Sequence, residues 1–344
     1  MSAKDNPLVS VIVLNYNGRE VLEPCLDSIF ASSYSPFEVI VVDNGSTDWS
    51  ADIARKKYDF RLLRKKHNVG FSAGNNSGIR AARGEFLVLL NYDTVVDPNW
   101  LSELVTATVR FGAGFSQPKI LMLNDPRIIN STGISIHIAG FGLLRGLGEI
   151  DTGQYDREWS ICAPHGACIF ASKEALEKIG LLDEHFFAFN DDTDLGWRAQ
   201  LFGYKVAYVP SARIYHVWGH KWKLKDPRKF YYLERNRLIM LLTNFSLRSL
   251  SLLFLILVLV EIFALGYSLL NGFLYAKIRG YSDLIRARNY IVARRNRIQK
   301  GRKIRDKEAV THFTCDLKHP IFGNPVSLVN WICRIFLSKI MRSI

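Results

Sequence analysis

Short runs of aliphatic and β-branched residues alternate with amphipathic stretches through the first 90 positions. The runs that predict strands occupy residues 8–14, 37–42, 60–63 and 85–90. Apolar positions that recur every three or four residues predict helices between them, at 18–31 and 73–82. Strands that alternate with helices in this way form βαβ units, so the pattern predicts an α/β fold with a mostly parallel sheet.

The pattern is less regular in the middle of the chain. Residues 112–161 are rich in glycine, and we expect loops and short strands lying over the sheet. Regular elements return as an ordered run at 163–170, helices at 173–179 and 195–202, and a last strand at 205–209. We place the end of this first domain at residue 245.

One long apolar segment follows the α/β pattern. Residues 250–276 carry a single charge, Glu261, and exceed the roughly 20 residues that a helix needs to cross a bilayer core. We therefore predict a membrane segment at 246–277. A second apolar stretch at 320–340 is interrupted by polar residues and proline, which is typical of an amphipathic helix at the membrane interface.

Positive charge concentrates directly after the long apolar segment. The chain of 344 residues has a net charge of +13, and residues 277–307 alone hold twelve Lys or Arg against two Asp. A basic block can bind nucleic acid or anionic lipid, and the neighbouring apolar segment favours lipid headgroups. We predict membrane lipids as partners, no nucleic acid, and a basic, amphipathic C-terminal region at 278–344.

The charge distribution also bears on topology. The polar N-terminus does not have the pattern of a signal peptide, and the positive-inside rule places the basic block in the cytosol as well. A single crossing would separate the two. We therefore expect a hairpin or monotopic segment bent near residues 261–266, with a single span as the alternative, and a first domain on the cytoplasmic face of the cell membrane.

Polar residues follow three of the predicted strands, where ligands of parallel sheets bind. They are Asn15, Asp43 and the triplet from Asn91 to Asp93. Asp43 can accept hydrogen bonds from a nucleotide base or ribose, or it can cap the next helix. Asp93 can hold Mg²⁺ or Mn²⁺ together with phosphate oxygens, or it can be an ordinary turn residue.

Three carboxylates lie within four residues at Asp191, Asp192 and Asp194. Their mutual repulsion should raise at least one pKa, which suits a general base, although a solvated helix cap is an alternative. Asp194 is the expected cap of the helix that follows. His216 can complete a metal site or act as a packing residue, and His220 can do either.

Together these stretches resemble the family-2 glycosyltransferases, and within them the rhamnosyltransferase-like enzymes. The resemblance covers about residues 7–244, and the matching stretches are 9–18, 41–48, 68–79, 86–96, 166–170 and 186–198. It implies a GT-A fold with C-terminal membrane-associated helices. Two positions depart from the family pattern, because Asn91 replaces the first Asp of a D-x-D motif and Asp191 replaces the Glu of an E-D pair.

The resemblance also implies a role for each matching residue. Asp192 is the implied catalytic base, with Asp191 beside it. The implied nucleotide-sugar ligands are Asn15, Asp43, Asn76 and Asn91, and the implied metal ligands are Asp93 and His216, which would hold Mg²⁺ or Mn²⁺.

The implied reaction is an inverting transfer of a sugar from a UDP- or dTDP-linked donor to an acceptor hydroxyl. The acceptor would be a glycan or a lipid-linked glycan of the cell surface. A catalytically inactive, membrane-tethered scaffold remains an alternative. A dinucleotide-dependent oxidoreductase is disfavoured because residues 15–18 lack the G-x-G-x-x-G fingerprint, and a processive synthase because the chain has no Q-x-x-R-W motif.

Overall fold

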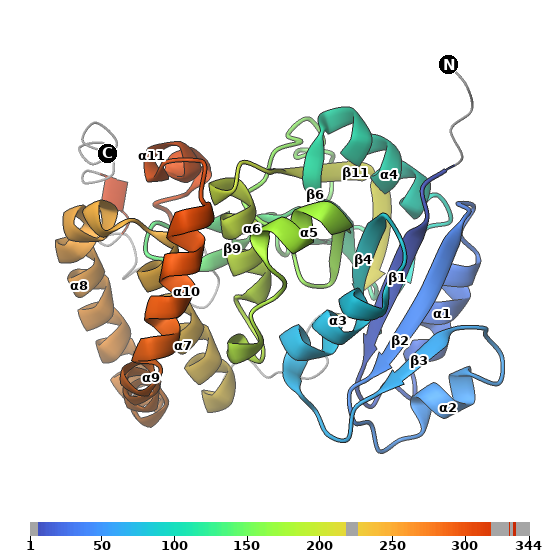
Figure 1. Ribbon diagram of the computed structural model, residues 1–344, viewed down its shortest axis with the longest axis horizontal. Helices are drawn as coiled ribbons and strands as arrows, with labels where there is room; N and C mark the ends of the chain where they lie inside the picture. The colour runs from blue at the N-terminus through green and yellow to red at the C-terminus, as the bar shows by residue number, and fades with distance from the viewer. Residues whose placement is uncertain (1–5, 218–225, 318–329, 331–332, 335–344) are drawn as a thin grey trace.

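The computed structural model describes residues 6–217, 226–317, 330, 333 and 334. Over these residues, a sheet with helices on both faces adjoins a group of C-terminal helices at one end of the molecule (Figure 1). His220 and most of the predicted interfacial stretch at 320–340 lie outside the described residues.

The main sheet has nine strands, in the order β3-β2-β1-β4-β10-β6-β11-β5 with β7 paired to β6. Its strands are β1 (Val9–Asn15), β2 (Phe37–Asp43), β3 (Arg61–Arg64), β4 (Phe86–Asn91), β5 (Thr94–Val96), β6 (Ala113–Met122), β7 (Ile129–Ser131), β10 (Cys168–Ser172) and β11 (Lys205–His216). A separate hairpin pairs β8 (Ile134–Ile136) with β9 (Gly142–Leu144).

Helices cover both faces of the sheet and form the C-terminal group. They are α1 (Leu22–Phe30), α2 (Ser50–Ala54), α3 (Gly70–Ala81), α4 (Trp100–Phe111), α5 (Lys173–Ile179), α6 (Asp191–Leu201), α7 (Pro227–Asn244), α8 (Leu247–Leu270), α9 (Leu274–Arg286), α10 (Arg288–Gly301) and α11 (Asp306–Ala309), with 3₁₀ turns η1 (Glu184–Phe186) and η2 (Val310–His312).

The parallel half of the sheet is buried on both faces. Side chains of β1 alternate between two cores. Val9, Val11 and Val13 pack with residues of α1 and α4, whereas Ile12 and Leu14 face residues of α3, α5 and α6. Burial on both faces explains why these strands are continuous apolar runs in the sequence.

The register of the parallel strands brings their carboxyl ends together. Strand β1 pairs with β2 on one side and with β4 on the other, and both pairs are parallel. Asn15 is the partner of Asp43, and Leu14 is the partner of Asn91. The predicted βαβ arrangement is therefore present, and three predicted polar positions lie along one edge of the sheet.

The middle of the chain is more regular than expected. Residues 112–161 include β6, a ten-residue strand in the centre of the sheet. Its polar residues concealed it, because Ser116, Gln117 and Lys119 are buried and Lys119 pairs with Asp151 and Asp156. The predicted last strand is also too short, since β11 continues to His216.

The apolar segment forms α8, the one helix in the described parts of the chain that is long and apolar enough to cross a membrane. The predicted bend near residues 261–266 is wrong, because α8 is continuous to Leu270 and the chain turns at Gly272. Glu261 does not break the helix because its carboxylate pairs with Arg237 of α7 and Lys277 of α9.

Candidate active site

Four elements position the candidate site at the carboxyl edge of the parallel strands. Residues after β1, β2 and β4 lie side by side there. The backbone N–H of Asn91 donates to Ala167 O at 3.0 Å, and the adjacent Gly166 N–H donates to Asp192 Oδ2 at 2.9 Å. A short series of contacts thus joins the ends of the strands to the N-terminus of α6.

The first two turns of this edge are tied to each other. Asn15 is fully buried, and its amide nitrogen donates to Ser50 Oγ at 2.9 Å, while its Oδ1 has no hydrogen-bond partner. Asp43 Oδ1 accepts from Ser46 N at 3.0 Å, which closes the turn after β2. The turn chemistry expected of Asp43 is therefore present, and the orphaned oxygen of Asn15 is a free acceptor beside it.

Asp93 and His216 form the candidate metal pair. Asp93 follows β4, His216 ends β11, and His216 Nε2 lies 3.5 Å from Asp93 Oδ1. That carboxylate oxygen is buried and has no hydrogen-bond partner, and the other ring nitrogen of His216 lies 3.3 Å from Asn130 Oδ1. An imidazole held by a second group and a carboxylate with a free oxygen fit a divalent cation.

Two protein ligands are fewer than a cation normally takes, and the described residues hold no group of three or more His, Cys, Asp or Glu side chains able to bind one. Phosphate oxygens of a bound nucleotide would complete such a site.

His165 is a further residue near this pair, and the sequence did not indicate it. Its ring lies 6.0 Å from that of His216, and its Nδ1 is buried without a partner.

Burial and the adjacent His216 lower the pKa of His165 to about 3. The ring is therefore neutral at physiological pH. The sequence signal for it was its position directly before the matching stretch 166–170, but a lone histidine before a strand has no distinctive pattern.

The two adjacent aspartates of α6 have different surroundings. Asp192 Oδ2 accepts from Gly166 N, and its Oδ1 accepts from Thr193 N at 2.7 Å, while its side chain remains partly exposed. Asp191 is buried, and Ser72 Oγ of α3 donates to it at 3.3 Å. Burial and the neighbouring Asp192 raise the pKa of Asp191 to about 8.

These differences favour different roles for the pair. Burial also raises the pKa of Asp192, but four hydrogen bonds that favour its ionised form oppose that effect. At neutral pH Asp191 is therefore protonated, whereas the hydrogen bonds to Asp192 favour its ionised form. Asp192 is the more accessible carboxylate of the two.

Asp194 is not the helix cap that was expected. Helix α6 begins at Asp191, with Asn190 as its N-cap. Asp194 is fully buried and forms ion pairs with Arg198 of α6 and Arg294 of α10. These arginines outweigh the effect of burial and lower the pKa of Asp194 to about 2. The alternative of a solvated acidic helix cap is therefore wrong for Asp194 as well.

Asn76 lies on α3, away from the turns. Its amide nitrogen donates to Leu182 O at 2.8 Å and to Glu184 Oε1 at 2.9 Å, and its oxygen accepts from Leu182 N at 3.1 Å. Both ends of the amide therefore hold α3 against the segment before η1. The role of Asn76 as a sugar-binding residue stays a prediction.

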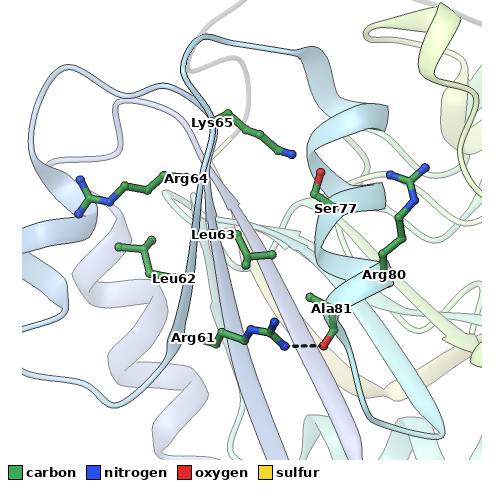
Figure 2. Close-up of a pocket in the computed structure, with 8 residues that line it drawn as sticks. All are labelled: Arg61, Leu62, Leu63, Arg64, Lys65, Ser77, Arg80 and Ala81. Atoms are coloured by element: carbon green, nitrogen blue, oxygen red, sulfur yellow. Dashed lines mark hydrogen bonds between the residues drawn. The ribbon is translucent and has the colours of Figure 1, made fainter.

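A shallow basic cavity of about 570 Å³ borders this edge, between β3 and α3 (Figure 2). Arg61, Arg64, Lys65 and Arg80 line it, but Arg64 pairs with Asp52 and Arg80 with Glu184. The cavity contains none of the predicted site residues. The cavity is connected to Asp43 through the backbone of Lys65, whose N–H donates to Asp43 O at 2.8 Å.

Comparison with known proteins identifies the domain. The family model for glycosyl transferase family 2 matches residues 10–180. An O-antigen biosynthesis protein, RfbC of Myxococcus xanthus, is 30% identical over 62% of this chain and 17% of its own length. A poly-β-1,6-N-acetyl-D-glucosamine synthase of Staphylococcus epidermidis is 27% identical over 59% of this chain and 48% of its own. The chain thus spans less than half the length of these relatives.

Solved structures share the fold at low sequence identity. A structure of GalNAc-T7 with UDP, GalNAc and Mn²⁺ has a TM-score of 0.57 at 15% identity, covering 70% of this chain and 48% of that one. Residues 1–349 of TarS from S. aureus give 0.52 at 14% identity, covering 97% of this chain and 88% of that one. With its GT-A-like sheet and its family match, the domain that contains residues 10–180 belongs to glycosyltransferase family 2.

Proposed function

We propose that this protein is an inverting glycosyltransferase that moves a sugar from a nucleoside-diphosphate donor to an acceptor hydroxyl. The observation that carries the proposal is the position of Asp192. Its partly exposed carboxylate accepts hydrogen bonds from Gly166 N and Thr193 N, and Gly166 is adjacent to Ala167, whose carbonyl accepts from Asn91 at the edge that carries Asp43 and Asp93.

In the proposed reaction Asp192 removes the proton of the acceptor hydroxyl as its oxygen attacks the anomeric carbon. The bond from that carbon to the donor phosphate breaks at the same time, and the nucleoside diphosphate leaves with the electron pair. Attack from the face opposite the leaving group inverts the configuration. The transition state has oxocarbenium character, as in glycoside hydrolysis.

The donor would bind along the turns after β1, β2 and β4. Asp43 and Asn15 would contact the base and ribose, and Asn91 would lie near the diphosphate. Asp93 and His216 would hold Mg²⁺ or Mn²⁺, which stabilises the charge of a departing diphosphate. The names of these relatives refer to O-antigen biosynthesis and poly-N-acetylglucosamine synthesis, which supports a role in cell-surface glycan synthesis.

Nucleotides provide the first test of this proposal. We expect UDP or dTDP with Mn²⁺ to raise the melting temperature, because a ligand that binds only the folded state stabilises it by about 2.7 kcal/mol at 100 times its Kd. The measurement is a thermal shift series with UDP, dTDP and NAD⁺, each with and without Mn²⁺, followed by a transfer assay with their sugars, dTDP-rhamnose among them.

A matched pair of variants controls this series. Asp43→Asn should abolish the stabilisation, whereas Asp125→Asn, at an exposed turn outside the site, should keep it. Stabilisation by NAD⁺ alone would contradict the proposal, and binding of a nucleotide sugar without any transfer would favour an inactive scaffold.

The C-terminal helices support attachment to a membrane. Most of α8 is exposed on one side, where Phe254, Leu255 and Ile262 are each more than 60% accessible. Helix α9 also exposes apolar side chains, namely Tyr275, Ile278 and Ile285. Arginines of α9 and α10 are exposed as well, among them Arg279, Arg286 and Arg288. Apolar side chains beside arginines fit an anionic bilayer surface.

The other side of α8 favours an in-plane arrangement over a crossing. Leu253, Ile256 and Val260 are buried against the rest of the protein, and the charged helix α7 joins α8 through the pair of Arg237 with Glu261. A crossing would place this ion pair and α7 at the depth of the hydrocarbon core, which is costly. The catalytic edge would then stay at the membrane surface, where a lipid-linked acceptor is accessible.

Vesicle binding tests this arrangement. We expect the protein to float with vesicles of phosphatidylcholine and phosphatidylglycerol, and the double change Leu255→Asp with Ile262→Asp to reduce binding at least 100-fold. Each buried aliphatic side chain contributes about 1.5–3 kcal/mol, and each new carboxylate opposes insertion further. Val109→Asp with Ile150→Asp is the control, because these residues are equally exposed on the catalytic domain.

Alkaline carbonate distinguishes the two topologies. An in-plane protein is released from native membranes, whereas a protein with a crossing helix stays in the pellet. Retention would overturn the in-plane arrangement, and dimerisation through α8 without flotation would overturn the lipid as the partner of this face.

A further inference from the structure

The loop that leads into Asp191 and Asp192 has an unusual backbone. Between η1 and α6, Phe187, Phe189 and Asn190 have φ angles of 65°, 68° and 61°. A residue other than glycine in such a conformation costs about 1–3 kcal/mol and persists only where its surroundings hold it. Asn190 is the N-cap of α6, so the conformation of this loop sets the position of Asp191 and Asp192.

The side chain of Asn236 on α7 holds this loop. Its amide nitrogen donates to Phe186 O at 3.1 Å, Ala188 O at 2.9 Å and Phe189 O at 2.8 Å. Two N–H groups thus serve three backbone carbonyls that point toward α7. Asn236 is fully buried, so removing its N–H groups would take this hydrogen bond away from the carbonyls of Ala188 and Phe189.

Arg235 completes the contact. Its Nη2 donates to His185 O at 2.7 Å and to Phe186 O at 3.1 Å. The same guanidinium donates to Asn236 Oδ1 at 2.9 and 3.0 Å, which fixes the orientation of the amide. From the loop side, Asn190 donates to Leu233 O at 2.8 Å. We call Arg235 and Asn236 the α7 clamp.

The loop also contacts the donor side of the site. Phe187 O accepts from Phe71 N at the start of α3 at 2.6 Å. Gly70 has a φ of 87°, and a Cβ there would lie 2.4 Å from Phe187 O, so no larger residue allows this approach. The loop therefore lies between α3, which carries Ser72, and α6, which carries Asp192.

We propose that Asn236, oriented by Arg235, is a positioning residue that holds the loop before α6 and thereby aims the Asp192 carboxylate at the acceptor hydroxyl. This inference rests on the proposed function of Asp192 as the base. Asn236 touches neither donor nor acceptor in this arrangement. It acts on the proton transfer alone, so its loss lowers kcat and leaves donor binding intact.

The test compares steady-state kinetics of the full-length protein and Asn236→Ala with the nucleotide sugar that the wild type uses. We expect kcat to fall about 100-fold, because a misplacement of about 1 Å costs this much. The KM for the donor and the melting-temperature shift produced by the nucleoside diphosphate should stay at their wild-type values.

Gln299 provides a matched control. Its amide nitrogen also donates to three carbonyls, those of Thr243, Asn244 and Phe245, but these end α7 rather than lead into α6. Gln299→Ala also loses three hydrogen bonds to backbone carbonyls and should keep the kcat of the wild type. Equal losses of kcat in both variants would overturn the proposal.

A second variant keeps the inference testable if Asn236→Ala does not fold. Arg235→Lys retains the positive charge and loses the guanidinium that binds two loop carbonyls and Asn236 Oδ1, so kcat should again fall while the donor KM is kept. A wild-type kcat in either folded clamp variant, or a parallel rise in donor KM, would overturn the inference. A wild type without transfer activity would instead refute the proposed function.

Discussion

Replacing Asp192 with asparagine is expected to lower turnover 10²- to 10⁴-fold, the usual contribution of a general base. Asparagine has the same shape, so donor binding at the turns after β1, β2 and β4 should be unchanged. The measurement pairs kcat for sugar transfer with the thermal shift produced by the nucleoside diphosphate. Turnover at the wild-type level would remove Asp192 as the base.

Asp191→Asn is the matched control for this variant. The pKa of Asp191 is raised to about 8 by burial and by Asp192, so this carboxyl is neutral at pH 7, and an amide is a close substitute for it. We expect most of the activity to remain. A loss as large as that of Asp192→Asn would instead indicate that the two carboxylates share the role of base.

The pH dependence follows from the same pair. Because the pKa of Asp192 is raised, the fraction in the basic form should increase over a range above the ordinary aspartate pKa of about 3.9. Turnover should therefore increase with pH through that higher range.

Much of the parallel half of the sheet could be predicted from the sequence. Strands β1, β2 and β4 are buried on both faces, so their apolar runs stand out and their polar ends are easily located. Asn15, Asp43 and Asn91 lie where those runs end, and the register confirms that they share an edge. Local sequence was sufficient here because each position depends on its own strand.

Elements whose polar residues have distant partners could not be predicted in the same way. Strand β6 contains Lys119, whose charge is neutralised by Asp151 and Asp156, far along the chain. Helix α7 has no continuous apolar side, because Glu234, Arg235 and Arg237 are all buried with partners on other elements. A pattern of apolar residues at helical spacing does not predict such helices, because their buried positions are charged.

The basic region at residues 277–307 also contains charged residues with distant partners. It was interpreted as a surface for lipid, and eight of its twelve cations are indeed exposed. Lys277 and Arg294 are not exposed, because each side chain is almost fully buried and forms ion pairs. The pair of Arg294 with Asp194 connects α10 to the helix that carries Asp192, so these C-terminal residues also support the helix of the proposed base.

Arg294→Ala is therefore expected to destabilise the folded protein by about 3–5 kcal/mol, the range for removing one partner of a buried ion pair. Arg294 pairs with Asp183 and Asp194 and donates to Asn244 Oδ1 at 3.3 Å. The change leaves both buried carboxylates without this partner. Urea unfolding at pH 7, followed by circular dichroism, measures the loss.

Arg297→Ala is the control, because Arg297 lies on the same helix with its side chain exposed, where substitutions usually change stability by less than about 0.5 kcal/mol.

Unfolding at low pH provides a second measurement of the same ion pair. In the wild type the low pKa of Asp194 adds stability above the ordinary aspartate range, and this stability is lost as the pH falls toward 2. Without Arg294 the buried Asp194 takes up a proton more readily, so the difference between variant and wild type should shrink as the pH is lowered. A loss below 1 kcal/mol at pH 7, or a difference that grows in acid, would show that α10 does not support α6 in this way.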